Sequence, residues 1–67
     1  MAKYFIETKK KTNVTDKLFG LVERWDVIKT IEYPSENEWR TAIKKIGIPD
    51  VCWLIQDDIM FKAYRLD

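Results

Sequence analysis

The chain has no histidine, and its 67 residues include one cysteine and one serine. Histidine is the usual general base of enzymes and the commonest metal ligand in proteins, so most hydrolase designs are excluded. The sequence also lacks a nucleophile elbow, a phosphate-binding loop, a glycine-rich dinucleotide turn and a paired cysteine motif. We therefore expect a protein that is not an enzyme and that holds no cofactor and no metal ion.

The single cysteine, Cys52, excludes an intramolecular disulfide. It lies within an apolar run, which is typical of a buried structural thiol. The N-terminus lacks the apolar core and the cleavage site of a signal peptide, and no stretch approaches the ~18 apolar residues of a membrane span. We expect a cytoplasmic protein.

Only two glycines and two prolines occur, alongside 46% hydrophobic and 34% charged residues. This composition is that of a folded soluble domain rather than a disordered tail. Residues 1–67 are expected to form a single domain with a small stability margin, because so short a chain buries only about 60% of the surface that its unfolded form exposes. The net charge of +1 argues against attachment to nucleic acid or to a membrane by bulk charge.

A helix is predicted within residues 34–49. Ser35 is the expected N-cap, and Glu38, three residues later, completes a capping box. An apolar stripe at helical spacing follows, made of Trp39, Ala42, Ile43 and Ile46. Gly47 suits the left-handed cap that ends a helix. We expect the helix at about residues 36–46.

The stretch VCWLIQDDIMFKAYRL, residues 51–66, predicts a β-hairpin. Its two halves are rich in β-branched and aromatic residues, and Asp57 and Asp58 supply a polar two-residue turn. This turn sets the expected pairs: Leu54 with Phe61 and Cys52 with Ala63 on one side, and Ile55 with Met60, Trp53 with Lys62 and Val51 with Tyr64 on the other. Both sides are apolar, so one helix can cover only one of them, and the other side needs a further layer.

The first half of the chain fits two arrangements. Residues 3–11 and 27–34 have the pattern of strands, whereas residues 16–26 suit either a strand or a helix that buries Leu18, Leu21, Val22 and Trp25. Gly20 would cost a helix interior about 1 kcal/mol, which favours the strand. We therefore predict an α+β fold: a small antiparallel sheet in the order β-β-β-α-β-β, with one amphipathic helix on one face. The alternative is β-α-β-α-β-β with a helix at residues 16–25.

Aromatic residues are frequent, at 13% of the chain. Tryptophan, tyrosine and methionine are enriched at protein interfaces. If the second side of the hairpin stays uncovered, we expect a protein interface there made of Trp53, Met60, Tyr64, Ile55 and Val51, with Trp25 from the first half of the chain as a further interface residue. The N-terminal strands could instead fold over this side as a second layer. The leading hypothesis is a small protein-binding module, a phage or bacterial accessory protein that modulates or inhibits a larger protein, or a homodimer through the hairpin.

Basic residues cluster near the N-terminus, where Lys9, Lys10 and Lys11 follow the aromatic Tyr4. Stacking rings beside basic side chains can bind single strands of nucleic acid, at ~1 to 3 kcal/mol for each stacked base. The alternative hypothesis is thus single-stranded nucleic-acid binding, although lysines at a strand end also keep a sheet edge from pairing. A metal-assisted nuclease that uses scattered carboxylates such as Asp57 and Asp58 is the third and weakest hypothesis. No small-molecule substrate and no membrane partner is indicated.

Overall fold

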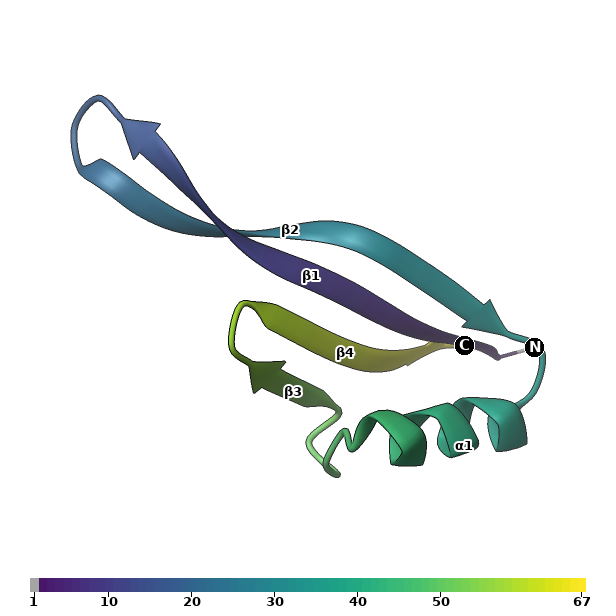
Figure 1. Ribbon diagram of the computed structural model, residues 1–67. Helices are drawn as coiled ribbons and strands as arrows, with labels where there is room; N and C mark the ends of the chain where they lie inside the picture. Colours follow the sequence, from purple (N-terminus) through teal and green to yellow (C-terminus); the bar gives the residue numbers. More distant parts are fainter. Residues whose placement is uncertain (1) are drawn as a thin grey trace.

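The computed structural model describes residues 2–67 and contains one antiparallel sheet and one helix (Figure 1). The elements are β1 (Lys3–Asp16), β2 (Gly20–Tyr33), α1 (Glu36–Ile46), β3 (Trp53–Gln56) and β4 (Ile59–Leu66). The strands lie side by side in the order β2-β1-β4-β3, so β1 and β4 are central. The predicted α+β class, a small antiparallel sheet with one helix, is confirmed.

The helix has the predicted bounds and the predicted caps. The Ser35 hydroxyl oxygen accepts a hydrogen bond from the Glu38 amide at 3.3 Å. At the other end Gly47 has a φ of 87°, and its amide donates to the Ile43 carbonyl at 2.9 Å. Both ends are therefore set by local chemistry that is visible in the sequence.

Two strands precede the helix, where the sequence predicted three. Residues 20–33 form one continuous strand, β2, that pairs with β1 along its length, with an irregularity between Thr8 and Lys9. The turn before it is closed by the Asp16 carboxylate, which accepts hydrogen bonds from the amides of Leu18 at 2.7 Å and Phe19 at 3.0 Å. Gly20 enters β2 with a φ of 75°, a conformation that glycine adopts without steric cost.

The alternative of a helix at residues 16–25 is wrong. The Asp16 turn and the left-handed Gly20 reverse the chain at that point, and β1 then supplies hydrogen-bonding partners for β2. Val14 pairs opposite Val22 in this ladder. A long-range ladder with β1 has thus prevailed over the helical spacing of the apolar residues.

The core is one layer between the sheet and α1. Its buried residues are Ile6, Trp39, Ile48 and Ala63, surrounded by the partly buried Tyr4, Tyr33, Ala42, Ile43, Ile46, Leu54 and Phe61. Trp39 anchors the helix to the sheet: its indole Nε1 donates to the Phe5 carbonyl at 2.9 Å, and its ring lies 5.2 Å from that of Tyr4. The helix therefore covers only the sheet face that carries Ile6 and Ala63.

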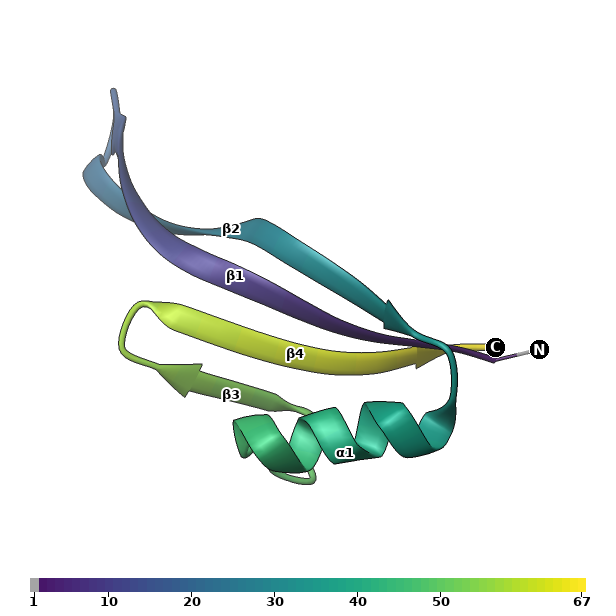
Figure 2. The same ribbon diagram turned by 45° about the vertical axis from the view of Figure 1, so that its right-hand side comes forward.

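The hairpin of β1 and β2 extends beyond the rest of the sheet. Strand β1 pairs with β4 only from Lys3 to Lys10, and the Lys11 amide still donates to the Asp58 carbonyl at 2.8 Å; further on, β1 pairs with β2 alone. We call this two-stranded extension, residues 11–25, the arm; it leads away from the sheet in both views (Figure 2). The radius of gyration of 14.4 Å exceeds the roughly 11 Å of a compact domain of this length.

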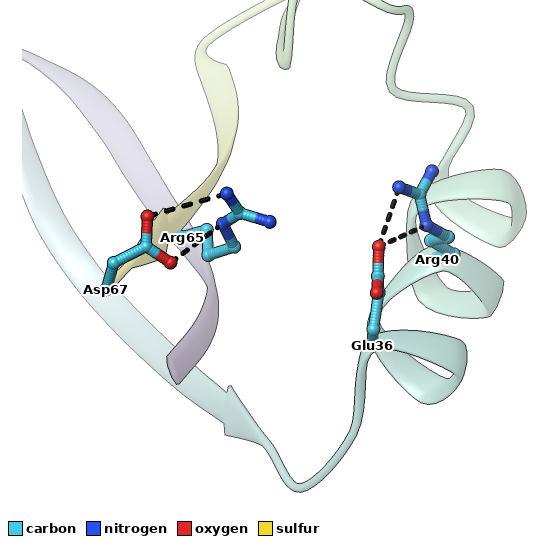
Figure 3. Close-up of polar contacts among 4 residues, drawn as sticks. All are labelled: Glu36, Arg40, Arg65 and Asp67. Carbon is cyan, nitrogen blue, oxygen red and sulfur yellow. Dashed lines mark hydrogen bonds and ion pairs between the residues drawn. The ribbon is translucent and has the colours of Figure 1, made fainter. Parts of the chain in front are cut away.

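Two of the surface ion pairs join residues that are close together in the sequence (Figure 3). In α1 the Arg40 guanidinium lies 2.7 Å from the Glu36 carboxylate, one helical turn away. At the end of β4, Arg65 Nε lies 3.2 Å from Asp67 Oδ1 (Figure 3). Exposed pairs of this kind contribute about 0 to 1 kcal/mol, so the stability of the fold comes mainly from the layer under α1.

We expect Ile6→Ala to lower the free energy of unfolding by about 2 to 5 kcal/mol, because it leaves a cavity at a side chain that is only 2% exposed. Urea denaturation followed by tryptophan fluorescence measures the loss. The matched control is Ile28→Ala, at a side chain that is 57% exposed, with an expected change within about 0.5 kcal/mol. Equal losses for the two variants would contradict the single-layer core.

Candidate functional site

The sheet face opposite α1 is uncovered. Ile6 and Ala63 point toward the helix, so their neighbours along each strand point to the opposite side. We call that side the open face; it consists of Phe5, Glu7, Lys9, Trp53, Ile55, Met60, Lys62 and Tyr64. Within residues 2–67 no further helix or strand lies over it. The N-terminal strands do not form the second layer that was one of the two expectations, because β1 and β2 belong to the same sheet.

Large apolar side chains on the open face are exposed to water. Trp53 is 50% exposed and Ile55 45%, whereas Met60 is half-buried. The rings of Phe5 and Tyr64 stack at 5.1 Å with an interplanar angle of 20°. These side chains therefore give three neighbouring strands an apolar and aromatic surface, with charged side chains interspersed.

A shallow depression of about 370 Å³ lies on this face, lined by Lys9, Trp53, Met60 and Lys62. Register brings these residues together, since Lys9 is opposite Met60 and Trp53 is opposite Lys62. The Lys9 ammonium also lies 3.4 Å from the Glu7 carboxylate. An indole, a thioether and two ammonium groups can bind an apolar side chain through dispersion and an adjacent polar or acidic group through charge.

The predicted interface residues are brought together in part. Trp53, Ile55, Met60 and Tyr64 share the open face, and the predicted pairs of Leu54 with Phe61, Ile55 with Met60 and Trp53 with Lys62 are confirmed. Trp25 pairs opposite Lys11 in the arm, on the side that continues the open face. Register and alternation thus place five of the six residues along one side of the sheet.

Val51 is the residue that departs from the expected register. Strand β3 begins at Trp53, so the predicted pair of Val51 with Tyr64 does not form, and Val51 lies in the preceding turn. The cause is Cys52, which has a φ of 69° and ends the ladder while its carbonyl still accepts the Ala63 amide at 2.8 Å. The prediction that Cys52 is buried is wrong for the same reason, since the thiol lies in an exposed bend.

The residues predicted for nucleic-acid binding lie on different sides of the sheet. Lys9 belongs to the open face, and Lys11 points to the same side and pairs with Glu23 at 3.1 Å. Lys10 alternates to the opposite side, and Tyr4 packs against Trp39 under the helix. The aromatic residues that share a face with Lys9 are therefore Phe5, Trp53 and Tyr64, and not the predicted Tyr4.

Sequence reasoning missed two sets of residues. Phe5 belongs to the open face, and strict alternation along β1 is the signal that places it there; Lys62 was expected on this side of the hairpin but was not named as a binding residue. At the arm tip, Leu18, Phe19 and Leu21 are 86%, 78% and 75% exposed. The signal for the tip was a short apolar run between Asp16 and Gly20, both of which favour turns.

A polar cluster lies at the base of the arm. The Thr12 hydroxyl donates a hydrogen bond to Asp26 Oδ2 at 2.9 Å, and Arg24 Nε lies 2.8 Å from Asp26 Oδ1. These contacts, the hydrogen bond from Thr12 first, hold the pKa of the Asp26 carboxyl below its usual value. Asp26 is therefore charged at neutral pH and links the two strands of the arm.

In the part of the chain that the structure describes, no three histidine, cysteine, aspartate or glutamate side chains are grouped so that they could hold a metal ion. Among those same residues, 2–67, no helix has the length and apolar character needed to span a membrane. No family model matches this sequence, and neither a curated protein nor a solved structure matches it. The open face and the arm are thus the features from which a function is inferred.

We expect Thr12→Val to raise the pKa of Asp26, because the hydroxyl that favours the carboxylate is removed. The lowered pKa stabilises the fold fully above the ordinary aspartate value, and this contribution disappears as the pH falls through the lowered pKa. Carboxyl carbon NMR titration of both proteins measures the shift. Thr15→Val, at an exposed position of the same strand, is the control; an unchanged Asp26 titration in Thr12→Val would contradict the assignment.

Proposed function

We propose that this protein is a non-enzymatic binding module that associates with another protein chain through the open face of its sheet. The observation that carries this proposal is the uncovered aromatic surface around Trp53, opposite the face that α1 covers. The helix covers one face of the sheet and leaves the apolar face exposed to water. Burial of that apolar face against a partner would therefore favour association.

The composition of the open face supports a protein partner. Trp53, Met60 and Tyr64 are of the residue types that are over-represented at interfaces or dominate their binding energy. Charged side chains, Glu7 and Lys62 among them, are interspersed with these apolar groups. Burial of each large apolar side chain would contribute on the order of 1.5 to 3 kcal/mol.

A small domain bound in this way acts by covering part of its partner's surface. With a mass of 8.1 kDa, the chain can occlude a site on a larger protein without contributing chemistry of its own. We propose modulation or inhibition of a larger protein as the biological outcome, in keeping with an accessory protein of a phage or a bacterium.

Trp53→Ala and Tyr64→Ala are expected to weaken association more than folding, because these side chains lie on the open face. Leu54→Ala should instead lower the free energy of unfolding by ~2 to 5 kcal/mol, because Leu54 packs against the buried core. Urea denaturation measures folding, and quantitative affinity capture from cell extract compares binding by the wild type and each variant. Equal losses of folding stability in all three variants would mean that the open face is part of the core.

Single-stranded nucleic acid is the second candidate ligand, favoured by one observation. Lys9 and Lys62 line the same depression as the half-exposed indole of Trp53. A base could stack on that ring while the ammonium groups contact phosphates. Against it, Lys9 and Lys11 are each within 4 Å of a glutamate carboxylate, which reduces their attraction for phosphate.

Salt dependence separates the two candidates. For the proposed protein interface we expect weak binding of a labelled single-stranded oligonucleotide and little change in protein association between low and high salt. Fluorescence anisotropy across a salt series measures oligonucleotide binding, and light scattering across the same series measures protein association. Tight oligonucleotide binding that weakens linearly with the logarithm of salt concentration, with a slope reduced by about one in Lys9→Gln, would favour nucleic acid instead.

A further inference from the structure

We infer that the open face is covered by the arm of a second copy of this chain, in a reciprocal dimer in which each arm crosses the partner's open face. This inference rests on the proposed function and names the partner. It is carried by the exposed surface area of the chain, by the apolar tip of the arm and by the match between the length of the arm and the width of the sheet.

The exposed area is too large for a compact monomer. The chain exposes 5361 Å². A compact monomer of 8.1 kDa exposes about 4,500 Å². The excess of roughly 900 Å² is close to the ~800 Å² that each partner buries in a standard protein interface. One interface of ordinary size, formed by the arm and the open face together, would therefore remove the excess.

The arm has the chemistry of a segment that packs against another surface. Its tip exposes Leu18, Phe19 and Leu21 by three quarters or more of their area. Leu21 and Trp25 lie on the side of the arm that continues the open face. A two-stranded hairpin without a third strand or a packed face is only marginally stable in water. Contact with an apolar surface would stabilise the arm.

The arm does not cover the open face of its own chain. Strand β1 runs without a break from the centre of the sheet into the arm, and β2 pairs with it throughout. The arm therefore leads away from the sheet, as both views show (Figures 1 and 2). Because the arm leads away from its own sheet, the surface that meets it in this arrangement belongs to another chain.

The length of the arm matches the width of the open face. From Lys11 to Asp16 the arm spans about 17 Å at ~3.3 Å per residue. Four strands at a spacing of ~4.8 Å give a sheet about 14 Å wide between its outer strands. An arm that crosses a partner sheet at right angles, one of the two usual sheet packings, would reach from β2 to β3. Its tip would then meet the depression lined by Trp53 and Met60.

Twofold symmetry makes the arrangement self-complementary. An isologous contact forms each interaction twice, so a chain that carries both an apolar tip and an apolar face buries both in one closed dimer.

The first test is the molar mass by light scattering over a concentration series. We expect a wild-type dimer that persists at high salt. The Leu18→Ser, Phe19→Ser double variant should dissociate at least ~100-fold more readily, because two large apolar side chains leave the interface.

Control variants separate this contact from a general loss of apolar surface. Val51→Ser removes a side chain that is 68% exposed but lies outside the open face and the arm, and it should leave the dimer unchanged. Trp53→Ala with Met60→Ala should dissociate the dimer as the tip variant does. Circular dichroism melts at low protein concentration show whether each variant still folds as a monomer. Dimers that survive the tip variant would overturn the inference.

A mixing experiment tests the reciprocal geometry directly. The tip variant and the Trp53→Ala, Met60→Ala variant are each expected to be monomeric alone. A mixture of them retains one intact contact, because the Trp53→Ala, Met60→Ala variant has an intact arm and the tip variant has an intact open face. We expect heterodimers in the mixture, detected by native mass spectrometry with one variant isotope-labelled. Two monomeric variants that do not associate when mixed would overturn the inference.

The outcomes also distinguish this inference from the proposed function. A wild-type chain that stays monomeric at all concentrations, but captures another protein in a Trp53-dependent way, would overturn the arm-exchanged dimer and leave the binding module standing. A monomer without Trp53-dependent capture would overturn both.

Discussion

A single helix of eleven residues can cover one face of this sheet and no more, and the other features of the molecule depend on that constraint. Trp39 ties α1 to the face that carries Ile6, and the buried residues among those that the structure describes lie in this one layer. The aromatic residues of the opposite face have no layer of their own within residues 2–67. Because a core this small leaves a thin stability margin, exposed apolar area on that side represents free energy available to association.

The continuity of β1 decides where a covering layer can come from. Had the chain turned after Lys10, the following strands could have folded over the hairpin as a second sheet. Instead β1 continues to Asp16 and stays paired with β2, so the extra length of both strands forms an arm that extends beyond the sheet. The continuation of β1 to Asp16 thus accounts for both the uncovered face and the exposed tip around Phe19. The two features are complementary in chemistry and in size.

Sequence patterns predicted the elements whose signals are local. The helix at residues 36–46 has its N-cap, its apolar stripe and its glycine cap within one short segment. The hairpin turn at Asp57 and Asp58 set the register that pairs Ile55 with Met60. Elements that depend on distant partners were predicted less well. Strand β2 is one strand because β1 pairs with it throughout, whereas the sequence predicted two strands in this region and left a helix around Leu18 as the alternative. Likewise, nothing local indicates that Cys52 takes a left-handed conformation and ends the β3 ladder.

The sequence by itself determined the α+β class, the helix with its caps and the alternation that gives the C-terminal hairpin two apolar sides, because these follow from short-range spacing. Only the tertiary structure decided which side α1 covers and that β1 and β2 extend past β4 as an arm. It also decided that Tyr4 packs under the helix while Phe5, its neighbour, lies on the open face. These outcomes depend on strand pairing between residues far apart in the chain, whose energies are set by packing rather than by local propensity.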